Sequence, residues 1–315
     1  MLKHGKAAVP CEFALLMLLG ILLGIPYALT KITLATIPPI TMVAARVSLA
    51  AIVLWILIFL LKRKLPKRRG LIPRLFIQGC LACILPYTLL AFGQRSVDSA
   101  LAAILNSTTP LFVCLLNLMW ARHETLTFGR LLGVSLGLVG CVLIAGASAL
   151  SGLSQSTLGQ ATIILATLAS AASVIHGHRF SDIPPEITAA GALTFAALFL
   201  VPLCFVVEAP LQSTPSAASV IALLVNAVVV TAFGFVIYFR LIRTIGSMGT
   251  ASASYLKPLV GVFIGCTFMS ESLTWTEAAG LTAILLGVTA INQGGLSSVP
   301  SRFVSKSVMP APGTN

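Results

Sequence analysis

The sequence predicts an all-α integral membrane protein with ten transmembrane helices, arranged as two inverted five-helix repeats. Three observations support this prediction: the composition, the number of long apolar segments, and a set of residues that recurs at a nearly constant spacing. The 315 residues are 57% hydrophobic and only 9% charged, whereas an average soluble domain carries roughly 25% charged residues. So few charged residues cannot solvate the surface of ordinary globular domains. A disordered chain would be poor in hydrophobic residues, so the composition excludes both classes.

Ten apolar segments are long enough to cross a bilayer, which takes about 20 residues of helix. They end at charges, prolines and polar runs. In order, the predicted spans are 13–30, 39–61, 75–93, 99–120, 131–149, 158–176, 187–207, 216–238, 248–269 and 276–293. The first follows Lys3 and Lys6, as a secretory signal would, but no small-x-small cleavage site follows it before Lys31. We therefore interpret it as a retained helix.

The cations predict the orientation of the chain. With the N-terminus inside, 16 of the 20 Lys and Arg residues fall on cytoplasmic segments, Lys31 and Arg95 fall outside, and Arg46 and Lys257 fall within spans. An even number of spans places both termini in the cytoplasm. The six cations between residues 62 and 69 are interpreted as a topology lock that touches anionic lipid, rather than as a nucleic-acid site.

The two halves of the chain carry similar residues in the same order. Segments 110–144 and 258–291 align with one gap, at an offset of 147 to 148 residues, and the pair Pro38-Pro39 recurs as Pro184-Pro185 at an offset of 146. The matched pairs are Pro110 with Pro258, Glu124 with Glu271, Leu126 with Leu273, Thr127 with Thr274, Gly133 with Gly280 and Gly140 with Gly287. Because each half has an odd number of spans, the second half would enter the membrane upside down, as in many secondary transporters.

The repeat predicts how the chain is divided. The expected parts are a cytoplasmic N-terminus (1–12), a first five-helix repeat (13–149), a linker (150–157), a second five-helix repeat (158–293) and a disordered cytoplasmic tail (294–315).

These residues resemble the EamA-like branch of the drug/metabolite transporter superfamily. The resemblance covers about 13–292 and rests on Glu124-Thr-Leu-Thr with Gly133 and Gly140, on Glu271-Ser-Leu-Thr with Gly280 and Gly287, and on Pro39 followed by Arg46. The chain departs from the family pattern at His123 and Ser270, where Gly is usual, and at Ala192, which stands where Arg46 stands in the first half. The resemblance implies a ten-helix permease for small metabolites, amino acids, nucleotide sugars or drugs, in a bacterial inner membrane.

Arg46 and Lys257 are the strongest candidates for a binding site. Each lies about nine residues from its helix start, and therefore roughly 13 Å deep, close to the middle of the bilayer. A charge at this depth costs about 2.5–3.5 kcal/mol or more, and the sequence places no Asp or Glu there. We predict a water-lined cavity in which these cations bind a carboxylate or phosphate. The alternative, which we favour for Arg46, is that they bind carbonyls freed by prolines or cap a broken helix.

Pro110 and Pro258 interrupt the fourth and ninth spans at matching positions. Discontinuous helices at corresponding places in two halves indicate a binding site. Asn106 and Tyr255 lie beside these prolines, and both need hydrogen-bond partners in an apolar interior. Tyr27 and Tyr87 are further candidates, with core or interface packing as the alternative. The predicted substrate-binding residues are therefore Lys257, Arg46, Tyr255, Asn106, Tyr27 and Tyr87, and the predicted helix-break and gating residues are Pro110 and Pro258.

Other motifs predict no enzyme, cofactor or metal site. The chain has no P-loop sequence, its Cys80-x-x-Cys83 has no second pair, and His123-Glu124 does not continue as HExxH because Thr127 holds the fifth place. GxxxG steps predict close helix packing, either within the chain or between two copies in a homodimer.

We therefore predict a secondary, non-ATPase transporter that exports a small polar metabolite or drug-like compound by alternating access. The cavity would be lined by the second, fourth and ninth helices, with the first and third contributing. Exchange, facilitated diffusion and proton coupling stay open. The alternative is a non-transporting membrane scaffold or lipid-handling protein. The expected partners are a small-molecule substrate and the lipid bilayer, with no nucleic acid.

Overall fold

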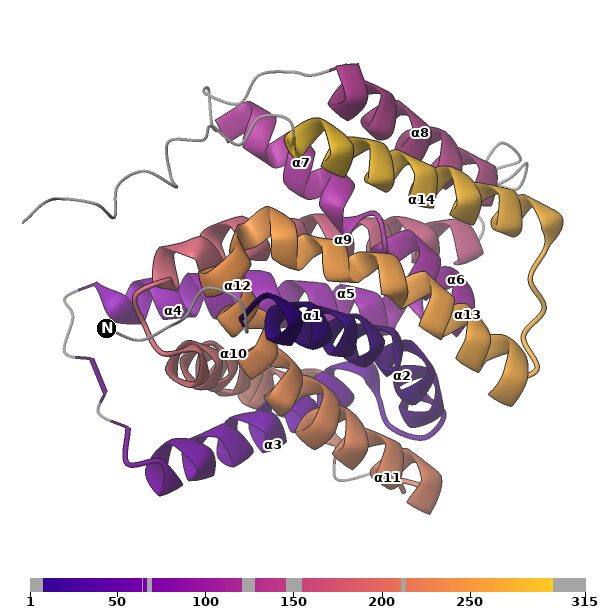
Figure 1. Cartoon of the computed structure of the whole chain (residues 1–315). Coiled ribbons are helices and arrows are strands. Elements are labelled where there is room, and N and C mark those ends of the chain that lie inside the picture. Colours follow the sequence, from indigo (N-terminus) through magenta and orange to yellow (C-terminus); the bar gives the residue numbers. More distant parts are fainter. Residues whose placement is uncertain are drawn as a thin grey trace, which may run out of the picture.

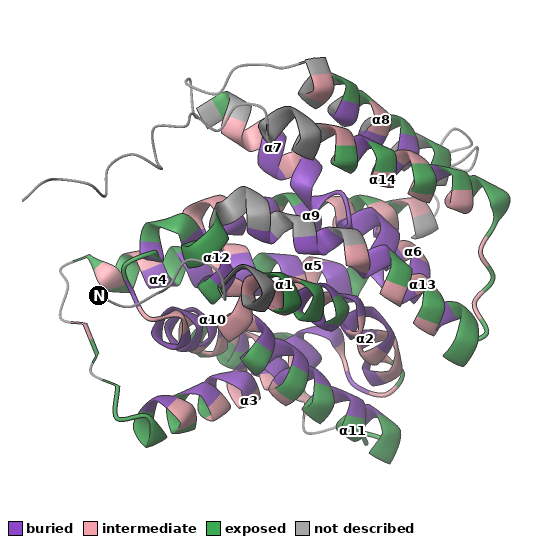
Figure 2. Ribbon diagram, viewed as in Figure 1, coloured by how far each residue is buried: buried purple, intermediate pink, exposed green. Residues whose placement is uncertain are grey.

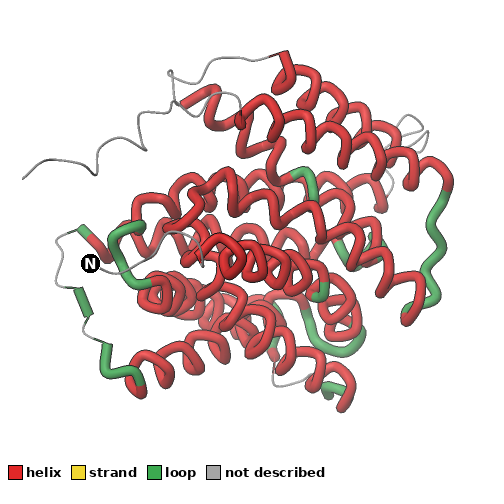
Figure 3. Tube along the Cα trace, in the orientation of Figure 1, coloured by secondary structure: helices red, strands yellow, loops and turns green. Residues whose placement is uncertain are grey.

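The computed structural model describes residues 8–63, 65–66, 70–120, 128–145, 155–210 and 214–296, and these residues form helices and no strand (Figures 1 and 3). The helices of the first half are α1 (Ala8–Gly24), α2 (Pro26–Leu34), α3 (Pro39–Leu60), α4 (Leu71–Gly79), the π-helix η1 (Cys80–Ile84), α5 (Leu85–Gly93), α6 (Ser99–Asn106), α7 (Thr109–Trp120) and α8 (Phe128–Ala145).

The second half repeats this order. Its helices are α9 (Gln155–Gly177), the short 3-10 helix η3 (His178–Phe180), α10 (Pro185–Val207), α11 (Ala217–Val225), the π-helix η5 (Asn226–Phe233), α12 (Gly234–Ala251), the 3-10 helix η6 (Ser252–Tyr255), α13 (Leu256–Phe268) and α14 (Trp275–Leu296). The predicted eighth and ninth spans are joined by helix rather than by a loop, because α12 continues through 239–247.

Seven helical stretches among the described residues are long and apolar enough to cross a membrane. They are Glu12–Leu34, Pro39–Leu60, Leu71–Gly93, Ser99–Asn117, Thr157–Phe180, Pro185–Val207 and Ala217–Ile245, with Leu256–Phe268 as a shorter apolar helix. The predicted fifth, ninth and tenth spans fall on α8, α13 and α14. Large apolar side chains are exposed along these helices, among them Phe59 and Val206 at 80% and 84%. Figure 2 shows exposed residues spread along the outer faces of the ribbons. Such a surface is suited to lipid and not to water.

The two halves pack through antiparallel helix pairs, of which α3 with α10 is one. At one end of this pair, Arg63 contacts Glu186 with an Nε–Oε1 distance of 2.9 Å. At the other end, the carboxylate of Glu208 accepts hydrogen bonds from the backbone N–H groups of Ile40 and Thr41, at 2.9 and 2.7 Å. Each helix therefore begins where its partner ends.

Helices α8 and α14 run side by side at the top of Figure 1. A Cβ added to Gly140 would lie 2.7 Å from the carbonyl oxygen of Gly280, and one added to Gly287 would lie 2.5 Å from that of Gly133. Real Cβ atoms do not approach a carbonyl this closely, so only glycine permits this crossing. The repeated glycines therefore pack against each other within the chain.

Candidate functional site

A cavity of about 120 Å³ lies between the two halves. By this measure a water molecule needs roughly 10–15 Å³, so the cavity has room for several. The lining residues are Leu23, Pro26, Tyr27, Arg46, Ala82, Pro86, Tyr87, Leu90, Asn106, Thr109, Ser170, Ser173, Val174, Val230, Gly234, Phe235, Tyr238, Thr250, Ser254 and Lys257. Five of the six predicted binding residues are among them. The sixth, Tyr255, is the last residue of η6, and its side chain lies outside the part of the chain that the structure describes.

Lys257 and Asn106 meet inside this cavity. The Nζ of Lys257, in the first turn of α13, donates a hydrogen bond of 3.0 Å to Oδ1 of Asn106, the last residue of α6. Both residues are less than a tenth exposed, at 7% and 6%. The partner of this buried ammonium in the described structure is thus a neutral amide rather than a carboxylate.

The helix interruptions explain why these two side chains point at each other. The fourth predicted span breaks after Asn106, and α7 begins at Thr109 with Pro110 as its second residue. The ninth breaks over η6, and α13 begins at Leu256 with Pro258 as its third residue. A proline in the first turn of a helix leaves no backbone bond unmade, so each proline starts a new helix.

Hydroxyl groups donate additional hydrogen bonds to the carbonyls at the first break. Ser107, Thr108 and Thr109 donate to the carbonyls three residues earlier, at 2.6, 2.7 and 2.6 Å. Unpaired carbonyls are costly in an apolar interior. The polar run after Asn106 is therefore explained by the break itself, and these hydroxyls serve the backbone.

Arg46 of α3 is held by partners that the sequence did not predict. Its Nε donates to Oγ1 of Thr231 at 2.7 Å, and its guanidinium carbon lies 4.0 Å from the centre of the Tyr87 ring. Thr231 donates in turn to the carbonyl of Asn226 within η5. The expectation that Arg46 would bind carbonyls freed by Pro110 or Pro258 is not what the described contacts show, because a hydroxyl and an aromatic ring hold it.

Aromatic rings form another wall of the cavity. The ring of Tyr87 packs edge-on against Phe235, which also contacts Tyr238, with centroid distances of 6.5 and 6.0 Å. Tyr27 is 3% exposed and lines the cavity from α2. Phe235 and Tyr238 come from α12, in the predicted eighth span, which was not expected to contribute. Ser170, Ser173 and Val174 from α9 were also missed.

Two π-helices border the cavity at equivalent places in the halves. η1 begins at Cys80 and η5 at Asn226, the same offset of 146 that separates Pro39 from Pro185. Ala82 in η1 and Val230 in η5 line the cavity. π-helical turns are frequent at functional sites because they redirect side chains out of helical register. No composition signal marks them, which is why the sequence alone did not reveal them.

A buried polar chain leads away from the cavity along α9. The hydroxyl of Tyr238 lies 3.5 Å from that of Ser173, whose hydroxyl and carbonyl both accept from Nε2 of Gln78. Oε1 of Gln78 lies 2.8 Å from Nδ1 of His176. This chain runs from Tyr238 in the cavity wall to His176 in the last turn of α9.

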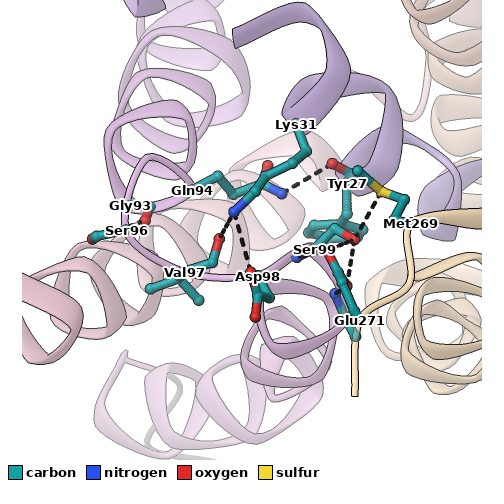
Figure 4. Close-up of polar contacts among 11 residues, drawn as sticks. Tyr27, Lys31, Gly93, Gln94, Ser96, Val97, Asp98, Ser99, Met269 and Glu271 are labelled. Atoms are coloured by element: carbon teal, nitrogen blue, oxygen red, sulfur yellow. Dashed lines mark hydrogen bonds and ion pairs between the residues drawn. The ribbon is translucent and has the colours of Figure 1, made fainter. Parts of the chain in front are cut away.

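Acidic residues tie the halves together at the two ends of the molecule, away from the cavity. At the end where α6 begins, the Glu271 carboxylate accepts from the N–H groups of Ser99 and Ala100 and from the Ser99 hydroxyl, at 2.8 to 2.9 Å (Figure 4). Beside it, Lys31 contacts Asp98 within the first half, at 3.3 Å. At the opposite end, Arg240 contacts Glu12 at 3.1 Å.

Comparison with known proteins gives consistent matches over almost the whole chain. The EamA-like transporter family matches residues 12–146 and 157–293. An uncharacterised transporter of Bacillus subtilis, YoaV, is 25% identical over 267 residues, covering 84% of this chain and 91% of its own. An uncharacterised inner membrane transporter of Escherichia coli, YedA, is 25% identical over 283 residues and 90% of each chain. A solved crystal structure shares the fold, with a TM-score of 0.67 and 16% identity, over 89% of this chain and 96% of that one.

Proposed function

Because the chain belongs to the EamA-like transporter family, we propose that this multi-pass membrane protein is a secondary transporter that exports a small polar metabolite by alternating access. The substrate would carry a carboxylate or phosphate group that binds Lys257. The observation that carries the proposal is the Lys257–Asn106 contact, which joins one residue from each half at two helix breaks inside a buried cavity.

The ten-span inverted architecture belongs to the same proposal. Gly133 corresponds to Gly280 in the repeat, and Gly140 corresponds to Gly287. The repeat therefore relates the contact of Gly140 with Gly280 to the contact of Gly287 with Gly133, and both contacts are present. Two contacts that are related by the repeat in this way support a two-fold relation between α8 and α14. We propose that both termini lie in the cytoplasm and that the end containing Glu271 faces outwards.

The positions of the cavity and of the acidic residues support the proposal of alternating access. The cavity lies between the halves, while Glu271 and Glu208 join them at one end, and the Glu12–Arg240 and Glu186–Arg63 pairs join them at the other. Loosening the contacts at one end while the other end stays closed would expose Lys257 to one side at a time. In this scheme the substrate anion takes the place of Asn106 as the partner of the ammonium.

Transport by the purified chain in proteoliposomes tests this proposal. We expect that a panel of amino acids, organic acids, phosphorylated metabolites and drug-like compounds contains at least one solute that exchanges across the membrane. The Lys257→Ala variant should lose this exchange while inserting normally, and Arg243→Ala, which removes an exposed charge from α12, should retain it. If no solute moves with the unmodified chain, the result would favour a membrane scaffold or lipid-handling protein.

A further inference from the structure

The charges that surround the cavity narrow the class of solute. Its lining includes two cationic residues, Arg46 and Lys257, and no acidic residue among the described residues that form it. Both cations are nearly inaccessible, at 3% and 7% exposed. Buried charges are stable only when they are compensated by partners of opposite charge or by strong hydrogen bonds. An anion is the partner that both cations lack within this lining.

The described acidic residues that could compensate these cations are engaged elsewhere. Those with described partners bind at the ends of the molecule or cap a helix: Glu12 with Arg240, Asp98 with Lys31, Glu186 with Arg63, Glu208 with the start of α3, Glu271 with the start of α6, and Glu277 with Thr274. None of them lines the cavity.

The described lining of the cavity offers no carboxylate to a positively charged group. A substrate ammonium needs hydrogen-bond acceptors, yet Oδ1 of Asn106 already accepts from Lys257. The carbonyls at the end of α6 already accept from Ser107, Thr108 and Thr109. A third positive charge would in addition be repelled by the two buried cations.

The aromatic residues of the lining indicate what kind of group the uncharged part of the solute contains. Tyr27, Tyr87, Phe235 and Tyr238 form an aromatic wall, and ring stacking favours a planar or apolar group next to it. From this arrangement we infer that the transported solute is a net anion with an apolar or aromatic body, an organic carboxylate rather than a zwitterionic amino acid. The inference rests on the proposed function, because it names the solute of the same cavity.

Four compounds that share a phenyl ring and a three-carbon chain separate these charge classes. They are 3-phenylpropionate, its uncharged amide, zwitterionic L-phenylalanine and cationic 3-phenylpropylamine. Isothermal titration calorimetry on the full chain in detergent should give an affinity for the carboxylate at least about tenfold above that for the other three. Equal or tighter binding of phenylalanine or of the amine would overturn the inference, as would the absence of carboxylate binding.

Two substitutions make the test specific to the cavity. Lys257→Gln should reduce the preference for carboxylate over amide to below about threefold, whereas Arg243→Gln, which removes the same charge from the exposed face of α12, should leave it unchanged. Asn106→Asp adds a carboxylate next to Lys257 and should shift the preference from the carboxylate towards phenylalanine. An unaltered preference in both cavity variants would contradict the inference.

Failure of the inference and failure of the proposed function have different signatures. If phenylalanine exchanges across proteoliposomes and 3-phenylpropionate does not compete with it, the chain is a transporter but its solute is not a net anion. If 3-phenylpropionate binds through Lys257 and no solute of any charge class exchanges, the anion site exists but the chain does not transport.

Discussion

The ammonium of Lys257 lies 3.0 Å from the side-chain oxygen of Asn106, although the two residues are 151 positions apart and belong to different halves. Neither residue would be in this position without the helix breaks, because Asn106 ends α6 and Lys257 begins α13. The contact links the positions of the two helix breaks to the charge on Lys257 in the cavity. A ligand that binds Lys257 therefore acts on both halves at once.

Asn106 is expected to contribute to stability as the acceptor for Lys257. Asn106→Leu leaves the ammonium without this partner and should lower the free energy of unfolding by about 1–3 kcal/mol. Asn106→Asp keeps an acceptor in the same place and should be no less stable than the unmodified chain. Unfolding in detergent, followed by circular dichroism, measures both variants. Equal stability of the Leu and Asp variants would contradict the role of the contact.

Thr231 is expected to position Arg46. Thr231→Val removes the hydroxyl that accepts from Nε of Arg46 at 2.7 Å and keeps the shape of the side chain. We expect thermal unfolding at a lower temperature, corresponding to a loss of about 1–3 kcal/mol, while Thr231→Ser retains the hydroxyl and serves as the control. A Val variant as stable as the Ser variant would show that Arg46 does not depend on this bond.

The glycine crossing between α8 and α14 gives a third prediction. Gly140→Ala places a Cβ 2.7 Å from the carbonyl oxygen of Gly280, so the helices must separate, at an expected cost of about 1–3 kcal/mol. At Gly234, the start of α12, an added Cβ would meet no atom of a neighbouring element within 4 Å, and Gly234→Ala should be neutral or stabilising. The thermal stabilities of the two variants in detergent test this contrast. Equal stability of the Gly140→Ala and Gly234→Ala variants would contradict the prediction.

Much of this arrangement follows from sequence patterns that have a direct physical cause. Matched prolines mark the two helix breaks because proline is best tolerated in the first turn of a helix, and Asn106 and Lys257 stand out because each needs a partner in an apolar interior. Seven of the predicted spans appear as long apolar helices. These features depend on residues close together in the chain, so they can be predicted from a single sequence.

The partners of Arg46 could not be predicted in the same way. Thr231 is 185 positions from Arg46 and lies in a π-helix, whose register has no composition signal. No sequence pattern predicted how closely α10 and the end of α4 approach. The carbonyl of Ala192 would lie 2.6 Å from a Cβ on Gly79, so only glycine fits at position 79.

Glu271 is expected to hold α6 against the end of α13. Glu271→Ala removes the acceptor for the N–H groups of Ser99 and Ala100 and should destabilise this end by about 0.5–2 kcal/mol. A cysteine introduced at Thr109 in the cavity should then react faster with a membrane-impermeant maleimide added to the outer face. Glu277→Ala is the matched control, because Glu277 accepts from Thr274 at the start of its own helix. Equal labelling rates in the two variants would contradict a closing role for Glu271.

The most direct test of the account is solute exchange by Lys257→Ala in proteoliposomes, measured with the solute that the unmodified chain transports best. Size-exclusion profiles and insertion should match those of the unmodified chain, so that any loss reflects the cavity. We expect exchange to fall at least about a hundredfold, because a buried charge–charge contact worth several kcal/mol is lost. Exchange at the unmodified rate would contradict the account, because Lys257 would then be a structural residue rather than the substrate's partner.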